Sequence, residues 1–187
     1  FLLFFEKESH PMALLARSLC ARSAFFAGRF QTTLSFENPD LVLSNVNGDA
    51  IDAEHLFKNK KVVLFGVPGA FTPICTTKHF PSFLDNAEAL KKKGVDTIGC
   101  VSVNDRFVMK AWGESMNAEG IELFSDADAS FVKTMELDVD LPPLGGTRSK
   151  RFVMLVDDGK VVLKNVEKTP GDFEVTGADV VLEKLSE

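Results

Sequence analysis

The chain has 187 residues, of which 45% are hydrophobic and 26% charged, a composition typical of one globular domain and not of a disordered protein. Its 21 Lys and Arg residues against 27 Asp and Glu give a net charge of −6, which argues against nucleic acid as a partner. No apolar run approaches the ~18 residues that span a bilayer, so we expect no membrane insertion. The three cysteines lack short paired spacings, which argues against a secreted disulfide scaffold and favours a reducing compartment.

The first 36 residues differ from the rest. Between Met12 and Phe36 the chain carries three arginines and no Asp or Glu, a composition typical of an organelle transit peptide. The arginines interrupt the apolar core that a secretory signal would need. We therefore expect residues 1–36, with Cys20, to be a leader directing the chain to the mitochondrial matrix, with a plastid or the cytoplasm as alternatives. Residues 37–187 are expected to fold as one domain.

The hydrophobic pattern of residues 37–187 predicts alternating strands and helices. Strands are expected at 41–45, 61–67, 95–103 and 121–126, with helices at 52–57, 75–94, 105–116, 129–137 and 177–185. Pro81 predicts a kink or break in the second helix, and residues 141–150 are too rich in Pro and Gly for regular structure. Residues 151–166 form a hairpin with a type I′ turn at Asp158-Gly159. This order predicts an α/β, thioredoxin-like fold: a mixed central sheet with helices on both faces and an N-terminal extension.

The stretch "PGAFTPIC", residues 68–75, follows the buried strand at 61–67. Thr72 is a favoured N-cap residue and Pro73 a favoured first helical residue, so a helix should begin between them at the carboxyl edge of the sheet. Cys75 then lies in the first turn, where unpaired N–H groups and the helix dipole favour an anion. The pattern predicts a nucleophilic thiolate, with a buried structural cysteine as the alternative.

Other chemistries fit this stretch less well. Residues 72 and 78 are Thr and Lys, so Cys75 has no CxxC partner for dithiol exchange. His79 follows one turn after Cys75, but a Cys-His acyl-transfer site would also need an orienting group and an oxyanion site, for which there is no motif. A structural, hydrogen-bonded role is expected for His79. Cys75, His79 and His55 lack metal-ligand spacing.

Three segments together resemble the peroxiredoxins, in the branch of the animal type-5 and plant type-II enzymes: "PGAFTPICTTKHFPSF", "GVDTIGCVSVNDRFVMKAW" and "KRFVMLVDDGKV". The similarity runs from about residue 42 to residue 185. It implies a thioredoxin-like fold and an antioxidant peroxidase that reduces hydrogen peroxide and organic hydroperoxides with no metal or organic cofactor.

The resemblance also implies roles for particular residues. Cys75 matches the peroxidatic cysteine, whose thiolate becomes a sulfenic acid. Thr72 matches the hydroxyl that hydrogen-bonds thiolate and peroxide, and Pro68 the residue that shields the pocket. Arg151 matches the arginine that holds the thiolate and polarises the peroxide.

Two further sets of residues have open roles. Arg148 is the alternative to Arg151, which we prefer because it directly precedes a strand. Phe71 and Leu144 are candidates for an apolar wall that admits alkyl peroxides, although ordinary core packing is an equal alternative for Phe71.

The sequence departs from the animal pattern at the second cysteine, because Val175 occupies the place of the resolving cysteine. Cys100 has the plant-like spacing of 25 residues from Cys75, but it interrupts a buried strand where a small apolar residue packs. It should lie roughly 10 Å below Cys75, so a disulfide would require the first helical turn to unwind. We therefore favour a one-cysteine cycle, with glutathione and glutaredoxin or thioredoxin as reductant, over Cys100 as the resolving residue.

A redox sensor or relay that passes oxidation from Cys75 to a partner protein is the alternative function. It begins with the same sulfenic acid, so the sequence does not separate the two. The family resemblance further implies a homodimer.

Overall fold

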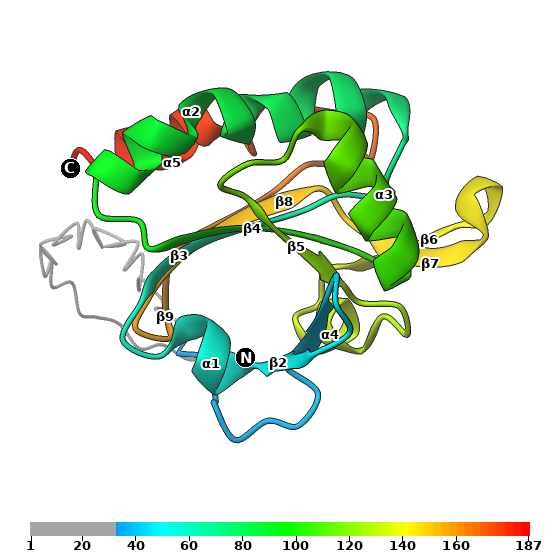
Figure 1. Ribbon diagram of the computed structural model, residues 1–187, viewed down its shortest axis with the longest axis horizontal. Coiled ribbons are helices and arrows are strands. Elements are labelled where there is room, and N and C mark those ends of the chain that lie inside the picture. The colour runs from blue at the N-terminus through cyan, green and yellow to red at the C-terminus, as the bar shows by residue number, and fades with distance from the viewer. Residues whose placement is uncertain (1–32) are drawn as a thin grey trace, which may run out of the picture. The chain divides into compact units, whose positions relative to one another are not determined.

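A seven-stranded mixed sheet organises residues 33–187, the part of the chain that the computed structural model describes (Figure 1). The strand order is β2-β1-β5-β4-β3-β8-β9. Strands β3, β4 and β5 run parallel, and every other pair in this sheet is antiparallel. The strands are β1 (Val42–Asn45), β2 (Ala50–Asp52), β3 (Lys61–Gly66), β4 (Thr97–Ser102), β5 (Glu122–Ser125), β8 (Phe152–Asp157) and β9 (Lys160–Val166).

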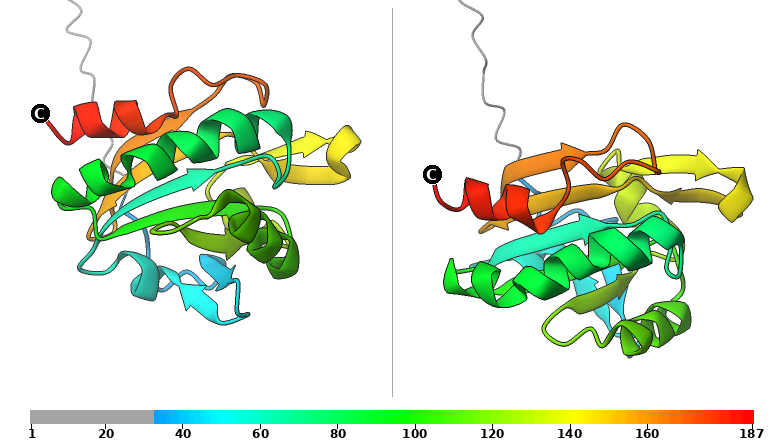
Figure 2. Two further views of the ribbon diagram at one scale, coloured as in Figure 1. Left: turned by 45° about the horizontal axis from the view of Figure 1, so that its top comes forward. Right: turned by 90° about the horizontal axis from the view of Figure 1, so that it is seen from above.

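Helices cover both faces of the sheet, as Figure 2 shows for α2 and α5 on one of them. One hydrophobic cluster joins the sheet to α2, α3 and α5, and a second joins it to α1 and α4. Strand β3 serves both, because Val62 and Leu64 lie in the second cluster while Val63 and Phe65 lie in the first. The helices are α1 (Ala53–Phe57), α2 (Phe80–Lys92), α3 (Arg106–Met116), α4 (Ser130–Thr134) and α5 (Ala178–Lys184). The predicted fold class is confirmed.

Local sequence signals account for several boundaries. The Asp105 side chain caps α3 by accepting from the backbone N–H groups of Phe107 and Val108. Asp158 and Gly159 have φ of 46° and 74°, so both central residues of the β8–β9 hairpin have the positive φ that a type I′ turn requires. Gly94 ends the α2 segment with φ of 86°.

Residues 141–150 are not irregular, so that prediction was wrong. They contribute to a separate two-stranded hairpin, β6 (Asp138–Leu141) paired with β7 (Gly146–Ser149), with a 3-10 turn at Pro142–Leu144. The prolines fall in the turn and not in the ladder, and Gly145 and Gly146 adopt φ of 91° and 108° at the tip. The composition therefore marked the tip of a hairpin.

Pro81 does not break the helix. A π-helical segment, η1 (Cys75–His79), comes immediately before α2, and the Phe80 N–H donates to the Cys75 carbonyl five residues earlier. Pro81 has no N–H to donate, and the wider turn before it lets the helix continue through this position. The expected distortion therefore takes the form of a π-helical segment at the predicted nucleophile.

The folded domain begins before residue 37. Thr33 pairs with Lys160 in an isolated bridge, and Leu34 is buried in the core with its N–H donating to the Gly159 carbonyl at 2.8 Å. Leu34 therefore packs with the core, close to the boundary expected at residue 36. The rest of the predicted leader, with Cys20, lies outside the described residues. No helix within residues 33–187 has the length and apolarity to cross a bilayer.

Candidate active site

Cys75 lies at the carboxyl edge of the central sheet. Strand β3 ends at Gly66, and the Val67 N–H still donates to the Val101 carbonyl of β4 at 3.0 Å. Helical structure starts at Pro73, as the Thr-Pro pair predicts, and puts Cys75 in the first turn. The Cys75 side chain is completely buried. Its thiol therefore lies at a helix start that favours an anion and that is closed to bulk solvent.

The loop before the helix is tied to the neighbouring strand. Asn104 accepts from the Ala70 N–H at 3.0 Å and from the Ser102 hydroxyl at 2.8 Å through its side-chain oxygen. Phe71 adopts φ of 61°, a left-handed conformation that costs about 1–3 kcal/mol in a residue with a side chain. Asn104 lies in the segment "GVDTIGCVSVNDRFVMKAW", but only the folded chain brings it to this loop, so its spacing in the sequence does not predict this role.

The Thr72 hydroxyl is directed back into the loop. It donates to the Gly69 carbonyl at 2.8 Å, and the Thr76 N–H donates to the Thr72 carbonyl at 3.0 Å. Because its hydrogen is committed to Gly69, the Thr72 oxygen is left as an acceptor.

Arg151 is the cation at the thiol. Only 2% of its surface is exposed, and Nη1 lies 3.5 Å from the Cys75 sulfur while Nη2 donates to the Pro170 carbonyl at 2.8 Å. No carboxylate lies within salt-bridge distance of it among residues 33–187. A buried charge without a counter-charge is costly, and the acceptors of this guanidinium are the Cys75 sulfur, the Pro170 carbonyl and His79.

Arg148 serves a different purpose. Its guanidinium donates to the Val103 carbonyl at 2.8 Å and to the Leu144 carbonyl. It therefore joins the tip of the β6–β7 hairpin to the end of β4. Of the two candidate arginines, the structure brings only Arg151 to Cys75.

His79 is fully buried between two partners that determine its protonation. Nε2 lies 3.1 Å from the Thr176 carbonyl, and Nδ1 lies 3.2 Å from Arg151 Nη1. A carbonyl only accepts and a guanidinium only donates, so the ring carries its proton on Nε2 and accepts at Nδ1. Burial, and then the Arg151 charge, lower the pKa of His79 to about 3. His79 is thus a neutral partner of Arg151, and its Nδ1 lone pair, which accepts from Arg151, is not available as a base for Cys75.

An apolar pocket of about 350 Å³ opens beside these residues. Among the predicted site residues, Pro68, Thr72, Arg151 and Leu144 line it. Phe71 is not among the lining residues and is 54% exposed. The other lining residues are nearly all apolar: Pro73, Ile74, Leu141, Pro143, Pro170 and Gly171. The pocket therefore suits an uncharged molecule with an apolar substituent.

Cys100 lies in β4, fully buried on the face of the sheet that α2 covers. It is paired opposite Phe65 on β3 and Leu123 on β5. Burial, and then the nearby Cys75, raise the pKa of the Cys100 thiol well above its ordinary value. Cys100 is therefore a neutral thiol fixed within the sheet. No group of three or more His, Cys, Asp or Glu side chains within 33–187 is arranged to hold a metal ion.

Comparison with known proteins decides the family. Residues 34–182 match the redoxin family. The chain is 48% identical over 132 residues to mitochondrial peroxiredoxin-2F of Oryza sativa subsp. japonica, covering 70% of this chain and 67% of that one. It is 46% identical over 157 residues to peroxiredoxin-2B of Arabidopsis thaliana, covering 82% and 92%. The chain is a peroxiredoxin.

The fold of this peroxiredoxin agrees with that of solved relatives. The crystal structure of reduced Prx3 from Vibrio vulnificus superposes with a TM-score of 0.78 at 47% identity, covering 84% of this chain and 97% of that one. A structure of the same protein in complex with H₂O₂ also gives a TM-score of 0.78. The predicted thioredoxin-like fold and thiol peroxidase activity are confirmed.

The neutral state of His79 predicts a pH-dependent stability. In the unfolded chain an imidazole has a pKa of about 6.5, whereas His79 in the fold titrates at about 3. Between these values the unfolded chain binds a proton that the folded chain does not. The contribution of His79 to the free energy of unfolding is therefore fully present above pH 6.5 and decreases as the pH falls. For this one group we expect a loss of about 1.4 kcal/mol per pH unit.

Urea unfolding of the wild type and His79→Gln at pH 7 and pH 5 measures this effect. The loss of unfolding free energy between the two pH values should be about 2 kcal/mol smaller in the variant. His55→Gln is the matched control, because His55 is exposed, and it should lose as much as the wild type. Equal losses in His79→Gln and the wild type would contradict the prediction.

Proposed function

We propose that Cys75 is the peroxidatic residue of this peroxiredoxin and that Arg151, Thr72 and Pro68 form its peroxide site. The observation that carries the proposal is the buried 3.5 Å contact between Arg151, which lines the apolar pocket, and the Cys75 sulfur. Within residues 33–187 no carboxylate neutralises this arginine. A buried cation beside a thiol at a helix start is the environment that makes cysteine a nucleophile.

The reaction follows from this arrangement. The Cys75 thiolate attacks one peroxide oxygen, a sulfur–oxygen bond forms and the oxygen–oxygen bond breaks. Cys75 becomes a sulfenic acid, and the other oxygen leaves as water from hydrogen peroxide or as an alcohol from an alkyl hydroperoxide after taking up a proton. The thiol sulfur is oxidised by two electrons and the peroxide is reduced by two.

The surrounding groups fit the needs of this step. Arg151 Nε is buried and has no hydrogen-bond partner among residues 33–187, so this donor is available to a peroxide oxygen as negative charge develops. The Thr72 oxygen is available to accept from the peroxide O–H, because its own hydrogen is held by Gly69. Pro68 contributes its ring to the pocket wall and helps to exclude water.

We propose a one-cysteine cycle in which an external thiol reduces the sulfenic acid. Cys100 is fixed in the middle of three paired strands with its thiol protonated. A disulfide with Cys75 would require Cα atoms within about 7 Å and a thiolate able to attack. Glutathione with glutaredoxin, or thioredoxin, is the proposed reductant.

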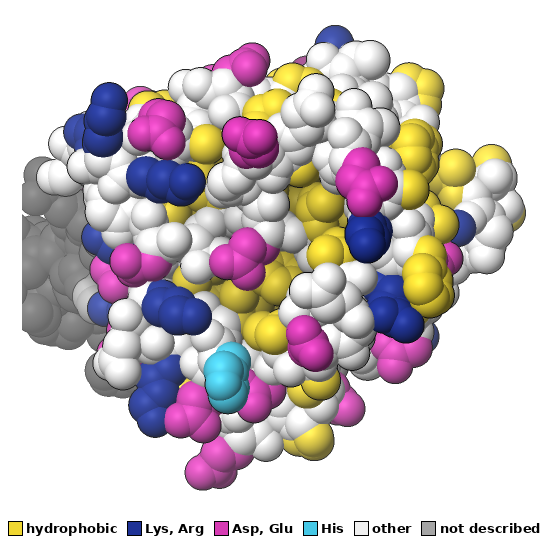
Figure 3. Space-filling model, viewed as in Figure 1, with side chains coloured by type: hydrophobic (Ala, Val, Ile, Leu, Met, Phe, Trp, Pro, Cys, Tyr) yellow, Lys and Arg dark blue, Asp and Glu magenta, His cyan; other side chains and the backbone are white. Residues whose placement is uncertain are grey.

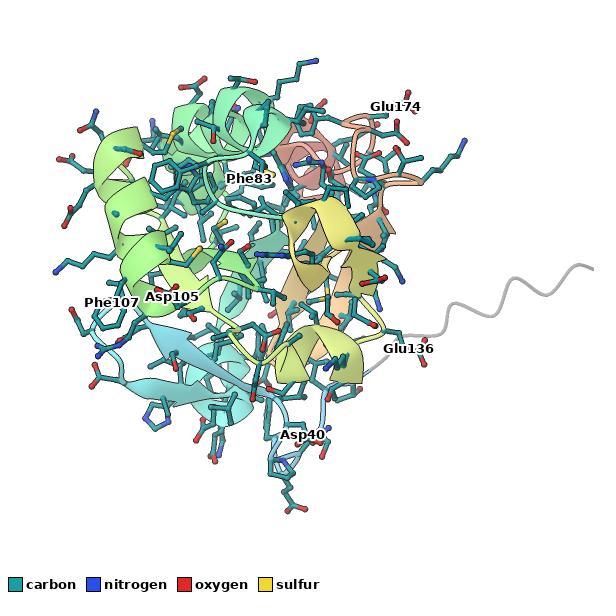
Figure 4. All side chains as sticks on the ribbon, turned by 90° about the vertical axis from the view of Figure 1, so that its right-hand side faces the viewer. Asp40, Phe83, Asp105, Phe107, Glu136 and Glu174 are labelled. Carbon is teal, nitrogen blue, oxygen red and sulfur yellow. The ribbon has the colours of Figure 1, made fainter. Side chains whose placement is uncertain are left out.

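The assembly and location are also proposals. Phe107 at the start of α3 is 68% exposed and points outward in Figure 4, with the Arg106 guanidinium 4.4 Å from its ring. Such an aromatic group supports a homodimer, since aromatic residues are enriched at interfaces. The face in Figure 3 mixes acidic with basic side chains, so it offers nucleic acid no continuous basic area. The basic leader and the mitochondrial relative in rice support the mitochondrial matrix.

Replacement of Cys75 tests the central role. Cys75→Ser should reduce peroxide consumption with either thiol reductant to the uncatalysed background, because a hydroxyl is not ionised at neutral pH. Cys100→Ser is the matched control and should retain turnover within about twofold of the wild type, an amount equivalent to less than 0.5 kcal/mol. Turnover by a folded Cys75→Ser protein would contradict the proposed role.

Leu144→Ala tests the apolar pocket. Removing this side chain from the pocket wall should lower kcat/KM for cumene hydroperoxide about fivefold to tenfold, since part of the contact with the organic group is lost. The value for hydrogen peroxide should change less than about twofold. Phe71→Ala, outside the pocket, should leave the ratio of the kcat/KM values for the two substrates unchanged. A large change of that ratio in Phe71→Ala instead would place the wall at Phe71.

Mass spectrometry after one equivalent of peroxide tests the one-cysteine cycle. With dimedone present, the peptide that contains Cys75 should carry the sulfenic acid adduct in most molecules. The yield should be the same in Cys100→Ser. A Cys75–Cys100 disulfide in most wild-type molecules, with the adduct appearing only in Cys100→Ser, would overturn the proposed cycle.

A further inference from the structure

Arg151 is held in place by a loop that lies outside the peroxide motif. Residues 167–177 connect β9 to α5, and two carbonyl groups of this segment face the site. The Pro170 carbonyl accepts from Arg151 Nη2 at 2.8 Å. The Thr176 carbonyl accepts from His79 Nε2, and His79 Nδ1 in turn accepts from Arg151 Nη1. The loop therefore positions the guanidinium directly and also through His79.

One carboxylate oxygen organises this loop. Glu167 is 7% exposed, and its Oε1 accepts from the Glu174 N–H at 2.8 Å, the Val175 N–H at 2.8 Å and the Thr176 hydroxyl at 2.9 Å. Its own N–H donates to the Arg151 carbonyl at 2.9 Å. The backbone of Glu167 is thus hydrogen-bonded to Arg151, the residue before β8. Its side chain binds residues 174–176 at the far end of the loop.

We propose that Glu167 is a positioning residue for the peroxidatic site, acting on Cys75 through the loop, His79 and Arg151. The inference rests on the proposed roles of Cys75 and Arg151.

The direction in which the Arg151 guanidinium points depends on its hydrogen-bond acceptors. Among residues 33–187 no carboxylate fixes Arg151, and its acceptors besides the Cys75 sulfur are the neutral groups at Pro170 and His79. Both depend on the path of the loop. Without the Glu167 carboxylate, three donors at residues 174–176 lose their shared acceptor. The Asn165 bond to the Val175 carbonyl and the Asp172 bond to the Thr169 N–H remain, so the segment that carries the two carbonyls is held less firmly and shifts. A shift of about 1 Å at the guanidinium is enough to weaken a reaction that depends on alignment by up to about 100-fold.

Glu167→Ala in the full-length chain tests the proposal. We expect the rate constant for oxidation of Cys75 by hydrogen peroxide to fall about 10- to 100-fold. Trp112, the only tryptophan, donates to the Thr76 hydroxyl next to Cys75 and provides the fluorescence signal for stopped-flow measurement. The pH profile of Cys75 alkylation by iodoacetamide, followed on the peptide that contains Cys75, should move to higher pH. A purely structural role for Glu167 would leave that profile in place.

Two matched variants complete the test. Glu174→Ala removes the same type of side chain from the same loop, but this side chain is exposed and lies at the edge of the molecule in Figure 4. The variant keeps the backbone N–H of residue 174, which donates to Glu167. The oxidation rate and the pH profile of alkylation should therefore match the wild type. Glu167→Gln keeps an oxygen acceptor and should restore the rate to within about threefold of the wild type.

A folded Glu167→Ala protein with the rate and alkylation profile of Glu174→Ala would overturn the proposal. If Glu167→Ala does not fold, Thr176→Val replaces it, because this variant removes one donor to Glu167 and keeps the Thr176 carbonyl and the side-chain shape. We expect it to slow the oxidation of Cys75 about threefold and to shift the pH profile of alkylation to higher pH. An oxidation rate and a pH profile equal to those of the wild type would overturn the proposal. A wild-type chain whose Cys75 does not react with peroxide would contradict the proposed function itself, and so the two failures are distinguishable.

Discussion

The site depends on the contact between the buried Arg151 guanidinium and the Cys75 sulfur. Most buried cations in proteins are paired with a carboxylate, but within residues 33–187 no carboxylate reaches this one. Its other acceptors, the Pro170 carbonyl and the neutral His79 ring, carry no full charge. The thiolate proposed at Cys75 supplies the missing negative charge, because an unpaired buried cation is costly.

The sheet brings these two residues together from positions 76 apart in the chain. Strands β3 and β8 are antiparallel neighbours with Gly66 opposite Phe152, so the end of one strand and the start of the other meet at the same edge. The Phe152 ring occupies the space beside Gly66, where an added Cβ would lie 1.9 Å from the ring. This close packing fixes the start of β8 and hence the backbone of Arg151.

Most of the fold could be predicted from the sequence because it depends on local signals. Runs of buried β-branched residues marked β3 and β4, and Asp105 and the Asp158-Gly159 turn marked boundaries that the structure confirms. The prediction of an irregular loop failed because amino-acid composition alone does not show which segments pair with each other. The Pro- and Gly-rich residues 141–150 contribute to a hairpin because β7 pairs with β6.

The sequence by itself determined that Cys75 lies in the first turn of a helix, because the order of threonine, proline and cysteine is a local signal. It also marked Arg151 through the family resemblance. Only the tertiary structure decided how that arginine is held, since its contacts with Cys75, His79 and Pro170 join segments far apart in the chain. Hydrogen bonds of this kind depend on distance and direction in space, which residue type and spacing do not specify.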